Sequence, residues 1–533
     1  MFHSLSSSLA RIRALIWPIY AHEHKKLVPM FVMLFLICIN YTLLKNMKDA
    51  LNVTASGAEV IPYIKLWVMF PSAVIATFAF TKLASHYSHE KVFYITISFF
   101  LGFYLLFIAV LYPLREHLHP YVMADYLEVT LPLGFKGIIA LFRNWTFTCF
   151  YVFSELWSCM VLTVLFWGFA NEVTKLEEAK RCYSFFNVAS NFASIIAGII
   201  PTACVYFVRA NFTEARQDDA SLTIQTVLVL ICGVATMFTF RWLNVNVLNG
   251  PEFDEFHQTK LKMKKKKRLS IRESFALLSG SRYLICIAIL VLGYNLGMNL
   301  LEVMWKNEMF LLYPSRSDFN SYIGKLTSIN GMLAMMVTLF IPKLLDRFGW
   351  TRTALITPVV MCITGGLFFG LILYQQWLPV SLFTILGTTP LAVIVYLGAF
   401  QNTTCKAFKF CLFDTTKEMA FIPLDNDVKL KGKAAIDGVG SRLGKTGGSV
   451  AYQGLLMIFP TLTACAPYVA TVFFFVICLW IYAVRALGVM FREKTGSALE
   501  PEDHDAENSQ ESSTLTASRD IHVDSPSPVP SSP

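Results

Sequence analysis

Charged side chains lie inside long apolar stretches of this sequence, where charge is rarely found. Lys48 directly follows the first of these stretches, Lys65 lies in the second, Glu155 in the fourth and Glu302 in the seventh. An ionisable side chain at the centre of a bilayer costs at least about 2.5–3.5 kcal/mol, so such residues usually have a function. We therefore predict that these four residues contribute to a binding site within a membrane protein.

Simpler interpretations stay open for some of these charges. Lys45, Lys48 and Lys306 lie near the ends of apolar stretches, so they could extend their apolar stems toward the membrane surface. Glu155 could be the structural partner of a basic residue. Arg143 opens the long fourth stretch, and we include it among the candidate substrate ligands.

A glycine-rich stretch near the C-terminus carries a further basic pair. Arg442 and Lys445 are three residues apart, so on a helix they share one face. Asp437 precedes them, and the surrounding glycines permit close approach of a neighbour or a ligand. A basic pair on a thin helix can bind phosphate, and we predict that these three residues line the site. The alternative is a packing seam with a local ion pair.

The sequence argues against enzyme chemistry, a cofactor and a metal site. Gly-Lys-Thr at 444–446 suggests a phosphate-binding loop, but that pattern needs glycine at position 439, which is valine. The histidines fall in loops and termini and form no metal-binding motif. The net charge of +9 is interpreted as a membrane-orientation signal, so no nucleic-acid partner is expected.

The elements that must position these residues are membrane-spanning helices. Of the 533 residues, 55% are hydrophobic and only 15% are charged, against about 25% charged in a soluble domain. We predict an all-α membrane protein with twelve transmembrane helices in two six-helix halves. The predicted regions are a cytoplasmic N-terminus (1–26), a first half (27–244), a basic cytoplasmic linker (245–281), a second half (282–492) and a disordered cytoplasmic tail (493–533).

This layout is typical of the major facilitator architecture, in which substrate binds near the midplane between two halves. The fourth apolar stretch, 138–170, is long enough to be tilted or to extend beyond the bilayer. Lysine and arginine concentrate in every second loop between the predicted spans. Because positively charged loops usually face the cytoplasm, this pattern places both termini in the cytoplasm. The excess of cations within the spans indicates an anionic substrate, such as a nucleoside polyphosphate.

Several long motifs resemble one transporter family. They lie at 40–49, 58–62, 154–157, 165–171, 302–306, 412–425 and 431–448. The chain is similar over about residues 15–490 to the nucleotide transporter family of obligate intracellular bacteria and plant plastids, whose best-known members are ATP/ADP antiporters. The resemblance implies functional roles for Lys48, Glu155, Glu302 and Lys445. It also implies import of host ATP in exchange for ADP and phosphate.

The same resemblance sets the expected location and leaves one alternative function. We expect a multi-pass protein of a bacterial inner membrane, with a plastid envelope as the alternative. Antiporters of the family usually read Arg-Asp-Thr-Lys-Asp where this chain has Lys45-Asn46-Met47-Lys48-Asp49. Proton-coupled import of other nucleoside triphosphates (GTP, UTP or CTP) is therefore the alternative to ATP/ADP exchange.

Overall fold

The structure is a computed structural model. It describes residues 24–174, 176–247, 280–338, 341–375, 377, 387–433, 435–436 and 440–495. Within these ranges the chain is almost entirely helical and contains no strand. The predicted N-terminal segment, linker and tail fall almost wholly outside them.

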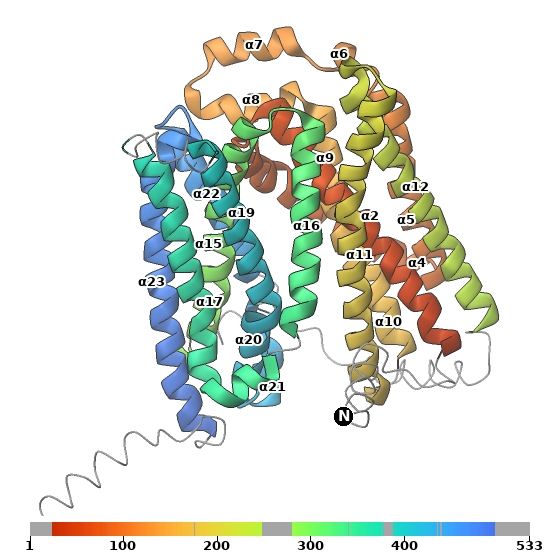
Figure 1. The fold of residues 1–533 in the computed structure, drawn as a ribbon. Helices are drawn as coiled ribbons and strands as arrows, with labels where there is room; N and C mark the ends of the chain where they lie inside the picture. Colours follow the sequence, from red (N-terminus) through yellow and green to blue (C-terminus); the bar gives the residue numbers. More distant parts are fainter. Residues whose placement is uncertain are drawn as a thin grey trace, which may run out of the picture.

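The helices of the first half begin with α2 and end with α12 (Figure 1). They are α2 (His24–Ser56), α3 (Val60–Tyr63), η2 (Ile64–Met69), α4 (Phe70–His86), α5 (His89–Leu106), η3 (Phe107–Leu111), α6 (Arg115–Leu118), α7 (Tyr121–Thr130), η4 (Leu133–Phe135), α8 (Lys136–Arg143), α9 (Trp145–Trp157), η5 (Ser158–Phe166), α10 (Trp167–Val173), α11 (Leu176–Asn211) and α12 (Glu214–Asn246). Three spans are composite, because α3, η2 and α4 follow without a break, as do α5 and η3, and α9, η5 and α10.

The second half runs from α15 to α23. Its helices are α15 (Arg282–Leu312), α16 (Arg316–Thr338), α17 (Ile341–Tyr374), α19 (Pro390–Phe408), η6 (Lys409–Phe413), α20 (Asp414–Ala420), α21 (Asn426–Lys433), α22 (Ser441–Leu456) and α23 (Leu462–Thr495). Within α17 the chain turns at Gly349, whose φ of 69° is one that glycine adopts without steric cost.

Nine helical segments in the described ranges are long and apolar enough to cross a membrane. They lie in α2, α3–η2–α4, α5–η3, α9–η5–α10, α11, α12, α15, α17 and α23. Helices α16, α19 and α22 fall at the other three predicted spans. The all-α membrane fold is confirmed, while the exact number of twelve spans stays a prediction.

The start of the fourth predicted span was placed too early. The chain breaks from helical geometry at Asn144, and the membrane-length segment begins at Trp145. The Asn144 side chain donates a 2.7 Å hydrogen bond to the hydroxyl of Ser56, which ties this break to the end of α2. The preceding residues form α8, which lies with α6 and α7 at one end of the bundle, here called the α7 end (Figure 1).

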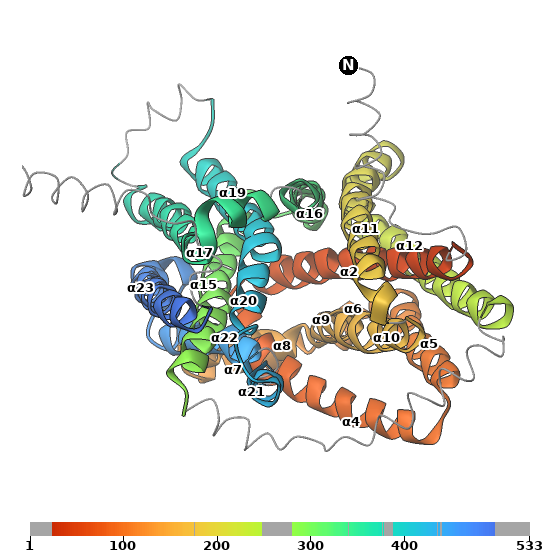
Figure 2. The same cartoon turned by 90° about the horizontal axis from the view of Figure 1, so that it is seen from below.

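Two hydrophobic cores hold the helices together. One is built from residues between Leu27 and Leu243, and the other mainly from residues between Tyr283 and Phe491. The second core also takes in residues from the C-terminal end of α2, from α3, and from α8 and α9. Seen along the bundle, α2 reaches from its own half toward α15, and α11 lies beside α16 (Figure 2). The two halves therefore pack against each other, and residues of the first half contribute to the core of the second.

Candidate functional site

Lys48 is buried on α2 and contacts two carboxylates and an aromatic ring. Its Nζ lies 2.9 Å from Asp49 Oδ1 and 2.9 Å from Glu155 Oε1, and its side chain is only 4% exposed. The same Nζ is 3.7 Å from the centre of the Tyr151 ring. Tyr151 and Glu155 are four residues apart on α9, so they present one helix face to the ammonium group.

The second half contributes a matching set of charges from α15 and α19. Glu302 and Lys306 are one turn apart on α15, with Oε1 and Nζ 3.3 Å apart. Lys306 Nζ also lies 2.9 Å from Asp49 Oδ2, and Lys406 Nζ of α19 lies 3.7 Å from Glu302 Oε1. A continuous series of ion pairs thus runs from the first half into the second.

We call this series the central charge chain. Its members are, in order, Glu155, Lys48, Asp49, Lys306, Glu302 and Lys406. It draws on α9, α2, α15 and α19, which are far apart in sequence. Burying ions is expensive, and the cost is offset only where each charge has close partners of opposite sign.

Two further lysines lie within electrostatic range of this chain. Lys45 interacts with Glu302 and Asp49, and Lys65 with Glu302 and Glu155. The cluster then holds five lysines (45, 48, 65, 306 and 406) and three carboxylates (49, 155 and 302), an excess of two positive charges. Such a cluster has electrostatic capacity for an additional polyanion.

Four of the predicted site residues meet in this cluster: Lys48, Lys65, Glu155 and Glu302. Asp49 and Lys306 were noted in the sequence but not included in the predicted site, and Lys406 was missed altogether. Glu302 and Lys306 carried a usable signal, because opposite charges four residues apart on a helix face each other. For Lys406 the signal was a lysine within the apolar stretch 390–408.

Arg143 lies apart from the central charge chain, so its predicted role as a substrate ligand stays a prediction. It ends α8, and its guanidinium pairs with Asp125 at 2.5 Å and with Glu128 at 2.7 Å, both on α7. With Glu59 and Lys136 it lines a cavity of about 190 Å³ at the α7 end. The apolar sequence around Arg143 suggested a membrane-embedded position, but α8 places it among the acids of α7.

The glycine-rich stretch forms α22, and its glycines pack against α15. A Cβ added at Gly444 would lie 2.8 Å from Asn295 Cβ, and one at Gly448 would lie 3.0 Å from Asn299 Oδ1. The side chains of Arg442 and Lys445 are exposed. The backbone carbonyl of Lys445 accepts a 3.0 Å hydrogen bond from Asn299, which precedes Glu302 by one turn. Asp437 lies outside the described residues, so its role stays a prediction.

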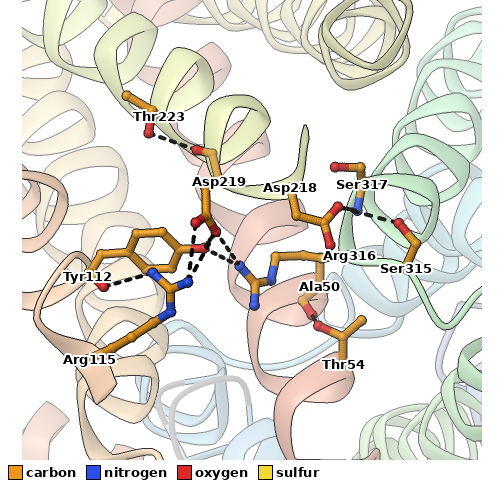
Figure 3. A network of polar contacts seen from close by, with 10 residues as sticks. All are labelled: Ala50, Thr54, Tyr112, Arg115, Asp218, Asp219, Thr223, Ser315, Arg316 and Ser317. Atoms are coloured by element: carbon orange, nitrogen blue, oxygen red, sulfur yellow. Dashed lines mark hydrogen bonds and ion pairs between the residues drawn. The ribbon is translucent and has the colours of Figure 1, made fainter. Parts of the chain in front are cut away.

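A second polar network joins the two halves at the α7 end (Figure 3). The Asp219 carboxylate on α12 pairs with Arg115 at 3.2 Å and with Arg316 of α16 at 4.0 Å. Tyr112 donates to Asp219 and accepts from Arg316. Burial raises the pKa of Tyr112 to about 12, so its hydroxyl keeps its proton at physiological pH.

The same network caps helix α16 from across the interface. Asp218 Oδ1 accepts a 3.0 Å hydrogen bond from the backbone N–H of Ser317 and a 3.4 Å bond from the Ser315 hydroxyl. A carboxylate at a helix N-terminus satisfies unpaired N–H groups and interacts favourably with the helix dipole. A first-half residue therefore stabilises the start of a second-half helix.

Helices α11 and α16 meet along a seam of small residues. A Cβ on Gly324 would lie 2.6 Å from the carbonyl oxygen of Gly198, and the hydroxyl of Ser328 donates a 2.7 Å bond to the Ile195 carbonyl. Small residues allow two membrane helices to approach at backbone distance. Together, the network at the α7 end and the seam between α11 and α16 close the two halves against each other.

Because Arg316 of the second half pairs with Asp219 of the first, Arg316→Gln should make the α7 end open more often. A partly exposed ion pair contributes about 0.2–1 kcal/mol, so its loss should raise the population open at the α7 end by up to about fivefold. The open population can be measured in a Ser321→Cys background, because position 321 is buried in the closed structure. The rate at which an impermeant maleimide labels this cysteine reports how often the α7 end opens. Arg143→Gln is the matched control, because both partners of Arg143 belong to its own half. Equal labelling in the two variants would contradict the assignment.

Comparison with solved structures defines the class of fold. The chain matches a D-xylose–proton symporter at a TM-score of 0.51 and 12% identity, over 90% of this chain and 98% of that one. It matches a bacterial metal transporter at a TM-score of 0.50 and 11% identity, over 86% and 98%. These likenesses show the fold alone, and that fold is the predicted major-facilitator-like one.

The sequence comparisons then identify the family. Residues 2–491 match the family model described as TLC ATP/ADP transporter, and the chain belongs to this family. It is 42% identical to "ADP,ATP carrier protein 1" of Chlamydia muridarum over 92% of this chain and 93% of that protein. It is 38% identical to "ADP,ATP carrier protein 1" of Rickettsia bellii over 90% and 96%. The resemblance seen in the sequence is confirmed, and the chain is a multi-pass bacterial membrane protein.

Proposed function

We propose that this chain is a secondary active transporter that imports ATP in exchange for ADP and phosphate across the inner membrane of a bacterium living inside host cells. The relatives named as ADP,ATP carriers support the substrates. The observation that carries the proposal is the cluster of five lysines and three carboxylates where the halves meet. On the predicted topology, the α7 end faces outward.

Lysines of the cluster neutralise the phosphates. Lys48 and Lys65 approach from the first half, while Glu155 and Glu302 hold the cations when no substrate is present. A phosphate must displace a carboxylate from a lysine, and this exchange of partners changes which contacts join the helices. A ligand shifts a conformational equilibrium only through such differential contacts, so phosphate binding is what permits the halves to rearrange.

Nucleotide uptake tests the proposal directly. Cells that produce the protein should take up labelled ATP, and preloading with ADP should accelerate the uptake. ATP recovered from the cells should be chemically intact, because the protein acts as a transporter and not as an enzyme. No uptake of ATP, GTP, UTP or CTP would refute nucleotide transport. Uptake of GTP, UTP or CTP that an uncoupler abolishes would instead support proton-coupled import.

Lys445 and Arg442 are proposed to contact phosphate from α22. Their exposed side chains and the position of Lys445 beside Asn299 support this role. Lys445→Gln should lower exchange about tenfold through a higher KM, since a charge-assisted hydrogen bond contributes about 1.5–3 kcal/mol. Lys82→Gln, at an exposed position near the end of α4, is the control. An unchanged KM in Lys445→Gln would leave α22 as a packing helix only.

A further inference from the structure

Asp49 is shared between lysines of the two halves. Its Oδ1 lies 2.9 Å from Lys48 Nζ and its Oδ2 lies 2.9 Å from Lys306 Nζ. The side chains of all three residues are at most 5% exposed. Each carboxylate oxygen therefore serves one lysine, and water contributes little to solvating any of them.

Within the central charge chain, the pair of Asp49 and Lys306 is the link that crosses from one half to the other. Lys48 and Glu155 pair within the first half, and Glu302 pairs with its lysines within the second. One turn before Asp49, the side-chain oxygen of Asn46 accepts a 3.4 Å hydrogen bond from Thr327 of α16. This stretch of α2 thus contacts two helices of the opposite half.

A phosphoryl group can take the place that Asp49 occupies. Both ammonium groups lie within hydrogen-bonding distance of a single carboxylate, so a tetrahedral phosphate, whose oxygens have similar spacing, can bridge them as well. A phosphate also carries more negative charge than a carboxylate and offers more acceptor oxygens. Substrate and Asp49 therefore compete for the same two cations.

We propose that Asp49 is the positioning residue that makes transport an obligatory exchange. In the unloaded carrier, Asp49 bridges Lys48 and Lys306 and thereby holds the two halves together. A nucleotide that takes these lysines frees the halves to rearrange, so an empty carrier does not return to the opposite side. The inference rests on the proposed exchange function and adds the residue that enforces it.

Proteoliposomes containing the full-length protein and loaded with labelled ADP provide the test. In the wild type, efflux should require external ATP. In Asp49→Asn, efflux without external nucleotide should rise about tenfold, because the empty carrier is no longer held. The purified variant should also bind ADP about tenfold more tightly, because no carboxylate competes for the lysines. Asp125→Asn, which removes an acid paired within the first half, should change neither quantity.

Asp49→Asn efflux that still depends fully on external ATP, or an unchanged affinity for ADP, would overturn the inference. If Asp49→Asn yields no folded protein, Lys306→Gln provides the test of the inference. This variant breaks the pair of Asp49 and Lys306 that joins the two halves, and it leaves the pair of Lys48 and Asp49 in place. That variant should also show efflux without external ATP, and strictly ATP-dependent efflux would refute the role. A wild type that exchanges no nucleotide would refute the proposed function instead, which is a distinct result.

Discussion

Replacing Lys48 with glutamine is expected to lower nucleotide exchange by about 100-fold or more. Asp49, Glu155 and the Tyr151 ring surround the ammonium group of Lys48. Removing one partner of a buried, hydrogen-bonded charge pair costs about 2–5 kcal/mol or more. The variant loses the proposed phosphate ligand and leaves Glu155 without the lysine that lies 2.9 Å from it. Exchange in proteoliposomes at matched protein content measures the effect.

A second variant separates substrate binding from structural pairing. In Lys48→Gln with Glu155→Gln, the lysine and its partner acid are both neutral, so the local charge balance is restored. If Lys48 binds phosphate, exchange stays at the level of the single variant although the protein folds normally. Recovery of exchange in the double variant would show that Lys48 serves only to balance Glu155. Lys136→Gln, at an exposed lysine of α8, controls for loss of a positive charge.

Replacing Gly198 with leucine is expected to abolish transport and to leave the protein open at the α7 end. A Cβ at this position would overlap the Gly324 carbonyl and would lie 2.6 Å from the backbone nitrogen of Ser328. Backbone atoms of α16 cannot move aside as a flexible side chain does, so α11 and α16 cannot close. Because each transport cycle must close this end, we expect at least about 100-fold lower exchange.

Cysteine labelling identifies the trapped state. Ser321 is buried, and its hydroxyl lies 3.0 Å from that of Thr202 on α11. In Gly198→Leu, a cysteine at position 321 should react with an impermeant maleimide added outside. Gly102→Leu is the matched control, because a Cβ at Gly102 meets nothing within 4 Å. Protection of the cysteine in Gly198→Leu, or normal exchange, would contradict the assigned closure.

Part of the site could be predicted from the sequence, because the cost of burying a charge depends on the residues directly around it in the chain. Lys48, Lys65, Glu155 and Glu302 each lie in or directly after an apolar stretch, and the cost of burying a charge marks such residues without any tertiary information. Helical periodicity adds neighbours on one helix, such as Lys306 one turn after Glu302. Neither consideration predicts a partner on another helix.

Arg143 and the glycines of α22 show where that reasoning ends. Arg143 adjoins an apolar stretch, but the break at Asn144 and the turn into α8 bring it to the acids of α7. Glycines beside Arg442 were compatible with close approach of either a neighbour or a ligand, and at Gly444 and Gly448 they provide space for α15. A glycine-rich stretch has the same composition whether a ligand or another helix packs against it, and only the position of the neighbouring helix distinguishes the two cases.

The sequence by itself determined that this is a helical membrane protein, which family it resembles and which buried charges need an explanation. Those properties follow from hydrophobicity, length and motifs read along the chain. The tertiary structure decided that Asp49 lies between Lys48 and Lys306, that Lys406 pairs with Glu302 and that the halves close at the α7 end. The pair of Asp49 and Lys306 joins residues 257 positions apart, and such contacts depend on how helices pack in three dimensions.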